Sequence, residues 1–364
     1  MATDVLSDSR TRGRHRWMKR LGPQNLGAIY AWIVLIIVFG LISPGNFLTI
    51  TTVKQVLNQY SITALAGLAL VLPLSAGLFD LSIGSTAALA GIGSAWWLAH
   101  VSISPTLAVL FGIGIALGCG LINAFVVVGL GVDSFIGTLA TSSIYTAATV
   151  AISGDEPISQ NVNGAFSTDI ALRNIGGITL PVIYMVVVML VIAFFLEKTV
   201  FGRRTYAVGF DLETARLGGV PVKGIQVVTL TVCATIAGIA GIVETATIGA
   251  GDPSIASYYL LPAFTAAFLG ATQFRHGRFN PWGAVVATLL IGTGDVGLLV
   301  VGAAAWTQDV FQGAVLIIAV AITSARGFGP LSGLARRWRR KDASAAQAAA
   351  PEAKASNAAG SMSP

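Results

Sequence analysis

Long runs of apolar residues are the feature that most constrains this chain. They cover Leu26–Ile42, Pro105–Leu130, Ile178–Leu196 and Gly313–Ile322. A helix needs about 20 predominantly apolar residues to cross a lipid bilayer, and the longer runs meet that requirement. Only 10% of the residues are charged, whereas a soluble domain carries about 25%. The sequence therefore excludes a soluble two-domain protein and predicts an all-α, polytopic membrane protein.

The apolar stretches predict about ten transmembrane helices. Four of them are interrupted by Gly, Pro or polar residues: the second, the third, the eighth and the ninth. Small residues four apart, as in Gly114/Gly118 and Ala237/Gly241, predict close packing between helices. The predicted spans are 26–43, 56–79, 82–100, 105–130, 134–152, 178–197, 225–248, 257–271, 281–303 and 307–325.

The positions of the basic residues predict the orientation. Cytoplasmic loops of membrane proteins carry an excess of Lys and Arg. With the N-terminus in the cytoplasm, only Lys54 and Arg173 of the 22 Lys and Arg residues fall on the outer side. Both termini are therefore expected to be cytoplasmic.

This orientation divides the chain into four parts. Residues 1–25 form a basic cytoplasmic tail, and residues 26–325 form the transmembrane domain. Within that domain, residues 198–224 form a polar, basic cytoplasmic loop. Residues 326–364 begin with a basic cluster, which we expect at lipid headgroups, and continue into an Ala/Ser-rich segment that we expect to be disordered.

Several kinds of chemistry have no motif in this sequence. It holds no Gly-x-x-x-x-Gly-Lys-Ser/Thr loop for a nucleotide and no His-Glu-x-x-His motif. Cys119 and Cys233 both lie in apolar stretches and cannot form a metal framework. The basic residues form loops and tails, not a nucleic-acid-binding face. We therefore expect neither an enzyme, nor a metal site, nor a nucleic-acid partner.

Charged residues inside membrane spans mark functional positions, because burying them in lipid is costly. Asp133, Asp252 and Asp309 lie near predicted span ends, where a carboxylate can cap a helix or reach water. Glu244 lies deeper and either lines an aqueous path or is neutralised by neighbouring helices. Asp80 begins the sequence Asp-Leu-Ser-Ile-Gly-Ser, which is typical of a helix start. A helix break at this depth is tolerated where it lines a cavity or is buried in protein.

Several segments resemble the permease subunits of ribose/xylose-type bacterial ABC sugar importers, a superfamily shared with branched-chain amino-acid permeases. Residues 76–91 are similar to that family's Gly-x-Asp-Leu-Ser-x-Gly segment, and 135–141 to its next landmark. Residues 201–220 match its Gly-Arg-x-x-x-Ala-x-Gly-x-Asn-x-x-Ala-Ala-Arg-x-x-Gly-Ile segment most specifically, with Asp211 where Asn is usual. The resemblance extends over about residues 45–325.

The resemblance implies a division of labour among subunits. Two permease subunits, identical or paralogous, would form the path for a monosaccharide. A cytoplasmic ATPase would bind ATP and Mg, and a secreted binding protein would deliver the sugar. This chain itself would bind no cofactor, and its loop at 198–224 would couple it to the ATPase. The predicted coupling residues are Arg203, Arg204, Gly209, Asp211, Glu213, Ala215, Arg216 and Gly218.

Polar groups on the early interrupted helices would then contact the sugar transiently. The candidates along the translocation path are Asn58, Gln59, Ser61, Asp80, Ser82, Ser85, Asn123, Thr138, Thr141 and Glu244. One alternative is a permease for branched-chain amino acids or nucleosides. An ion-coupled secondary transporter, with Asp80 and Glu244 as proton sites, is a more distant alternative. A membrane scaffold is the least favoured, because it would have no use for polar interrupted helices.

Overall fold

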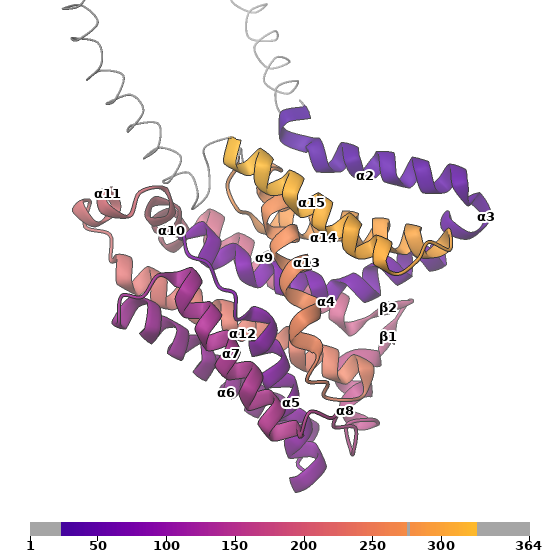
Figure 1. The fold of residues 1–364 in the computed structure, drawn as a ribbon, viewed down its shortest axis with the longest axis horizontal. Helices are drawn as coiled ribbons and strands as arrows, with labels where there is room; N and C mark the ends of the chain where they lie inside the picture. The colour runs from indigo at the N-terminus through magenta and orange to yellow at the C-terminus, as the bar shows by residue number, and fades with distance from the viewer. Residues whose placement is uncertain (1–22, 275–276, 326–364) are drawn as a thin grey trace, which may run out of the picture.

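The computed structural model describes residues 23–274 and 277–325, and Figure 1 shows their arrangement. The N-terminal part of the bundle contains α2 (Pro23–Ile42), α3 (Pro44–Phe47), α4 (Ile50–Ser75), α5 (Ile83–Val101), α6 (Pro105–Ala124), the π-helix η1 (Phe125–Gly129) and α7 (Ser134–Ser153). A connecting segment follows, with α8 (Ala165–Ser167), the π-helix η2 (Thr168–Leu172), β1 (Asn174–Ile175) and β2 (Ile178–Thr179). The rest comprises α9 (Leu180–Lys198), α10 (Val200–Phe210), α11 (Leu212–Leu217), α12 (Val222–Ile248), α13 (Ile255–Ala271), α14 (Pro281–Val300) and α15 (Trp306–Ala325).

The helices confirm an all-α polytopic membrane protein. Within the described residues, seven helices are long and apolar enough to cross a membrane: α4, α6 continued by η1, α7, α9, α12, α14 and α15. Shorter apolar stretches lie in α2 and α13, and α5 is a buried helix of 19 residues. Each predicted span coincides with one of these helices. The number of crossings and the location of the termini stay predictions, and nearly all of both tails lies outside the described residues.

Two predictions about individual helices are wrong. The third, eighth and ninth spans, which were expected to be interrupted, are continuous helices. Only the second predicted span is broken, after Ser75, and the break is not at Pro73. The break falls between α4 and α5, where Gly77 has a positive φ. The second span was also placed too late, because α4 begins at Ile50, six residues before its predicted start. Its first turns are polar, so hydropathy could not detect them, although the Thr49 side chain caps them.

Small residues bring the central helices into close contact. An added Cβ on Gly241 of α12 would overlap the carbonyl oxygen of Ala87 on α5, and one on Gly238 would overlap Ala116 of α6. Such close approach favours helix association in lipid, which confirms the prediction for Ala237/Gly241. The prediction for Gly114/Gly118 is wrong, since neither glycine has a described neighbour within 4 Å of an added Cβ.

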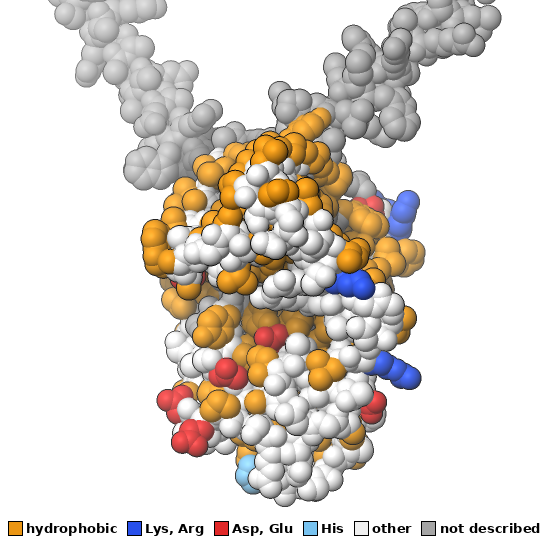
Figure 2. Space-filling model, turned by 90° about the vertical axis from the view of Figure 1, so that its right-hand side faces the viewer, with side chains coloured by type: hydrophobic (Ala, Val, Ile, Leu, Met, Phe, Trp, Pro, Cys, Tyr) orange, Lys and Arg blue, Asp and Glu red, His pale blue; other side chains and the backbone are white. Residues whose placement is uncertain are grey.

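The segment 154–179 is folded onto the end of the bundle. Its residues Val162 and Phe166 are buried, and its short strands β1 and β2 pair antiparallel. The Asn58 side chain of α4 accepts hydrogen bonds from the Thr179 N–H and hydroxyl, at 3.0 and 3.1 Å. On the face drawn in Figure 2, most acidic side chains lie in the lower half, whereas hydrophobic side chains cover much of the upper half.

Candidate functional site

The turn at residues 76–82, between α4 and α5, is the centre of the candidate site. Ser134 and Thr138 of α7 hold its extended backbone. The Phe79 N–H donates to the Ser134 hydroxyl at 3.1 Å, and the Leu81 N–H donates to the Thr138 hydroxyl at 3.0 Å. Backbone groups that leave a helix inside a membrane must find partners within the protein. The α7 hydroxyls therefore make the helix break possible. We call residues 76–82 the inner turn.

Asp80 lies at the middle of the inner turn and is fully buried, with 0% of its surface exposed. Its Oδ1 accepts hydrogen bonds from the Ser82 N–H at 2.9 Å and from the Ser82 hydroxyl at 2.6 Å. Its Oδ2 has no hydrogen-bond partner among the described residues. Buried polar atoms are nearly always hydrogen-bonded. Oδ2 is therefore a buried acceptor without a described hydrogen-bond partner, beside the Cys233 thiol of α12.

A network of side chains extends from Asp80 into the helices behind it. Asn123 of α6 donates from Nδ2 to the Ser82 hydroxyl at 2.7 Å. Its Oδ1 accepts from Thr141 at 2.7 Å and from Tyr145 at 3.0 Å, both on α7. Ser85 of α5 donates to the Ser142 hydroxyl of α7 at 3.0 Å. The network thus fixes the inner turn relative to α5, α6 and α7.

Replacing Tyr145 by phenylalanine should destabilise this network. The hydroxyl donates to the Cys119 carbonyl at 2.9 Å as well as to Asn123. Hydrogen bonds between membrane helices contribute on average about 0.6 kcal/mol each, so we expect a loss of about 1 kcal/mol. Thermal melting of the purified protein measures this loss. Tyr258→Phe is the control, because Tyr258 is 67% exposed, and an equal melting temperature for both variants would contradict the prediction.

The structure brings together six of the ten predicted path residues: Asp80, Ser82, Ser85, Asn123, Thr138 and Thr141. The other four lie elsewhere. Asn58 contacts the segment before α9, Ser61 donates to its own helix at 2.9 Å, and Gln59 is exposed. Glu244 of α12 is half-buried and lies near Tyr259 of α13. The path role of every one of these residues stays a prediction.

Sequence reasoning missed three members of the network: Ser134, Ser142 and Tyr145. A signal for them exists, because Ser134, Thr138, Thr141 and Tyr145 recur at helical spacing. They therefore share one face of α7, and this face packs on the inner turn. These polar residues on α7 indicate a site only when α5 is known to lie beside them.

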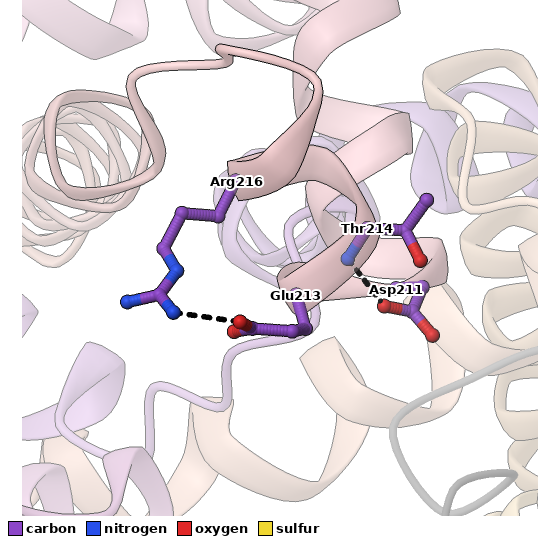
Figure 3. A network of polar contacts seen from close by, with 4 residues as sticks. All are labelled: Asp211, Glu213, Thr214 and Arg216. Carbon is purple, nitrogen blue, oxygen red and sulfur yellow. Dashed lines mark hydrogen bonds and ion pairs between the residues drawn. The ribbon is translucent and has the colours of Figure 1, made fainter.

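The coupling segment at residues 198–224 contains two helices, α10 and α11. Asp211 caps α11 by accepting from the Thr214 N–H at 2.8 Å, and Glu213 forms an ion pair with Arg216 at 2.6 Å (Figure 3). This short helix carries an acidic residue in its first turn and a cation in its last, which suits the helix dipole. Leu217 at its end is 81% exposed, so α11 presents an apolar tip between charged side chains.

The helix α10 contacts the inner turn directly. Gly209 lies so close that an added Cβ would overlap the carbonyl oxygen of Ser75, and Gly77 faces the Gly209 Cα. Val208 and Ala76 belong to one buried apolar cluster, which Ala215 of α11 extends. The predicted coupling segment and the predicted path therefore meet along a packed backbone contact.

The remaining coupling residues differ in their surroundings. Arg203 and Arg204 are exposed on α10. An added Cβ on Gly218 would meet only carbonyl oxygens of its own turn, at 3.4 Å, so the structure does not require glycine there. On another face of α10, Tyr206 donates to the Phe279 carbonyl at 2.7 Å, and the Arg278 guanidinium lies 5.5 Å from the Tyr206 ring centroid. The helix α10 thus joins two parts of the bundle, the inner turn and the turn before α14.

A second buried carboxylate, Asp295 of α14, lies outside this site. Its Oδ2 accepts from Tyr60 of α4 at 2.9 Å and from Gln312 of α15 at 2.7 Å, while Oδ1 has no partner among the described residues. This arrangement attaches α15 to the bundle. In the part of the chain that the structure describes, no three His, Cys, Asp or Glu side chains are grouped as a metal ion would require.

Comparison with known proteins places the chain in a family. Residues 52–320 match the family described as "Branched-chain amino acid transport system / permease component". The D-allose transport system permease protein of Escherichia coli is 32% identical over 81% of this chain and 90% of its own length. The ribose import permease protein of Bacillus subtilis is 29% identical over 82% of this chain and 92% of its own length.

A third relative is named for a third sugar, fructose. The fructose import permease protein of Rhizobium meliloti is 29% identical over 80% of this chain and 82% of its own length. These matches cover the inner turn, the network on α7 and the coupling segment. They confirm the resemblance that the motifs around Asp80 and Arg216 predicted. The chain belongs to the family of permease components typified by the branched-chain amino acid transport systems.

Proposed function

We propose that this chain is the membrane-spanning permease subunit of an ATP-binding-cassette importer for a monosaccharide. It forms the translocation path in the bacterial cytoplasmic membrane together with a second permease copy. A secreted binding protein delivers the sugar, and a cytoplasmic ATPase holds the ATP and Mg. The contact between α10 and the inner turn is the observation that carries this proposal, because it joins the coupling segment to the path.

The proposed mechanism is alternating access. The ATPase binds at α11, where Leu217 and the Glu213–Arg216 pair are exposed. Movement of α11 displaces α10, and Gly209 transmits the displacement to the backbone of the inner turn. The inner turn then moves relative to α7 and opens or closes the path. The sugar hydroxyls exchange hydrogen bonds with the network as they pass, and no group holds the sugar tightly.

The substrate class follows from the relatives and from the polar network. The relatives are named for D-allose, ribose, fructose and L-arabinose. A sugar presents hydroxyl groups that both donate and accept hydrogen bonds. Asp80, Ser82, Asn123 and Thr141 supply matching carboxylate, hydroxyl and amide groups. A branched-chain amino acid, as in the family description, would leave this network without partners along its apolar side chain.

Capping of α11 provides a test of the docking role. Asp211→Ala removes the hydrogen bond to the Thr214 N–H, and loss of such a cap costs about 1 kcal/mol. We expect α11 to fray and sugar-stimulated ATP hydrolysis to fall several-fold. Asp211→Asn keeps an acceptor oxygen and should retain full coupling. Equal ATPase rates for the alanine and asparagine variants would contradict the docking role.

Transport itself is tested in proteoliposomes that hold the chain with its ATPase. We expect internal ATP and the binding protein to drive uptake of at least one of D-ribose, D-allose, D-fructose and L-arabinose. Leucine and a nucleoside serve as competing substrates. Uptake of leucine in place of all four sugars would overturn the assignment to monosaccharides and favour the amino-acid alternative.

A further inference from the structure

A second turn in the chain repeats the sequence of the inner turn. Residues 249–255 read Gly-Ala-Gly-Asp-Pro-Ser-Ile, and residues 77–83 read Gly-Leu-Phe-Asp-Leu-Ser-Ile. Gly77 and Gly249 both have φ of +77°, a conformation that favours glycine. The Asp, Ser and Ile of each turn follow the glycine at identical spacing. We call residues 249–254 the outer turn.

The two turns also share their internal hydrogen bonds. Asp252 Oδ1 accepts from the Ser254 N–H at 2.8 Å and from the Ser254 hydroxyl at 2.7 Å, as Asp80 Oδ1 does from Ser82. Each turn follows a long helix, of 26 residues in α4 and 27 in α12. Each leads into a helix that begins at the isoleucine, either α5 or α13.

The helices around the two turns repeat as well. If α4, α5, α6 and α7 correspond to α12, α13, α14 and α15, then the main contacts in one set have counterparts in the other. The helix α12 packs on α5 and α6, and α4 packs on α13 and α14. Similarly, α5 contacts α7, and α13 contacts α15. The bundle is therefore built from two repeats that pack against each other.

The two repeats run in opposite directions through the bundle. The inner turn contacts Gly209 of α10, whereas Gly251 of the outer turn exchanges two backbone hydrogen bonds with Ile158, both at 2.8 Å. In Figure 1, α10 and the segment with α8 lie at opposite ends of the molecule. In transporters built from inverted repeats, one repeat rocks against the other to give alternating access.

The two turns differ in burial. Asp80 and Ser82 of the inner turn are both 0% exposed. In the outer turn, Asp252 is half-buried and Ser254 is exposed. The α7 hydroxyls hold the inner turn closed, whereas the outer turn is held at Gly251 by the loop before α8. The same local motif is thus buried in the inner turn and partly exposed in the outer turn.

From this asymmetry we propose that the outer turn is a second gate, and that the inner and outer turns exchange their conformations during transport. The inner turn opens when it leaves Ser134 and Thr138, and the outer turn is buried in the same transition. This inference rests on the proposed function only in placing the inner turn on the path. It assigns to Asp252 and Ser254 the role at the outer side that Asp80 and Ser82 have at the inner side.

Cysteine labelling in lipid nanodiscs tests the exchange without an ATPase or a sugar. Single cysteines replace the equivalent central residues, Leu81→Cys in one protein and Pro253→Cys in another. The two native cysteines, which are buried, are replaced by alanine in both. A membrane-impermeant maleimide then reports how accessible each turn is. The inner turn is loosened by Thr138→Val combined with Ser134→Ala.

The matched control is Thr149→Val. Thr149 is also buried on α7, but its hydroxyl donates to Tyr145 of the same helix, at 2.8 Å. Relative to this control, we expect loosening to speed labelling at position 81 and to slow labelling at position 253, each about fivefold. Thr138→Ser, with Ser134 intact, should restore both rates because it keeps the hydroxyl.

Each result decides the question. Opposite changes at the two positions support the exchange, even if the chain transports something other than a sugar. An unchanged or faster rate at position 253, with a faster rate at position 81, would show that the turns move independently and would overturn the proposal. An unchanged rate at position 81 in protein that still melts cooperatively would also overturn it, because α7 would then not hold the inner turn closed.

Discussion

Gly209→Ala is expected to lower ATP-driven uptake strongly while leaving the protein folded in the membrane. The added methyl group would overlap the Ser75 carbonyl oxygen. This oxygen belongs to the backbone and cannot rotate away. Overpacking of this kind costs about 1–3 kcal/mol, so α10 must move away from the inner turn. Because a difference of about 1.4 kcal/mol changes an equilibrium tenfold, we expect uptake to fall at least about tenfold.

The control for this variant is Gly224→Ala. Gly224 lies in the same coupling segment, but an added Cβ there has no described neighbour within 4 Å. We expect normal uptake from Gly224→Ala and full ATP hydrolysis with strongly lowered uptake from Gly209→Ala. Uptake and ATPase stimulation at the normal level in Gly209→Ala would show that α10 does not transmit movement to the inner turn.

Asp80→Asn is expected to lower uptake at least about tenfold, with little change in stability. Asparagine keeps the acceptor oxygen for both hydrogen bonds from Ser82. It replaces the unpartnered Oδ2 by an amide that donates, so a sugar hydroxyl loses its acceptor. Asp80→Ala should in addition lower the melting temperature, because Ser82 and Asn123 lose their place in the network. Uptake assays and thermal melting of the same preparations separate the two effects.

Asp295→Asn is the matched control for Asp80→Asn. Asp295 is also buried, 1% exposed, with one oxygen hydrogen-bonded and the other without a described partner. It lies between α4, α14 and α15, away from the inner turn. We expect uptake to remain within about twofold of the unsubstituted protein. Equal losses of uptake from both substitutions would show that any buried carboxylate matters and would remove the special role of Asp80.

The fold could be predicted from hydropathy to the extent that each helix is apolar along its length. Lipid requires long apolar segments, so most of the spans were placed within a few residues. Prediction was wrong for α4, because its first turns carry Lys54, Gln55 and Asn58 and contact the β-hairpin at Thr179. It was also wrong about interruption, because Pro73 and Pro262 lie within continuous helices.

The site could be predicted only in part, for a different reason. Asp80 and Ser82 were found because polar residues that start a helix inside an apolar region are conspicuous. The α7 hydroxyls of Ser134 and Ser142 were not found. Serine is common within apolar helices, and its hydrogen-bond partner is known only from the tertiary packing. Gly209 was named from a resemblance, but its contact with Ser75 could not be derived from the sequence.

Reconstitution of the purified chain tests the central claim most directly. The chain is placed in proteoliposomes with a sugar gradient and a pH gradient, once alone and once with its ATPase, the binding protein and internal ATP. We predict accumulation of sugar against its gradient only in the complete system, and none from the chain alone at any pH gradient. Accumulation driven by protons through the chain alone would contradict the account and favour an ion-coupled transporter.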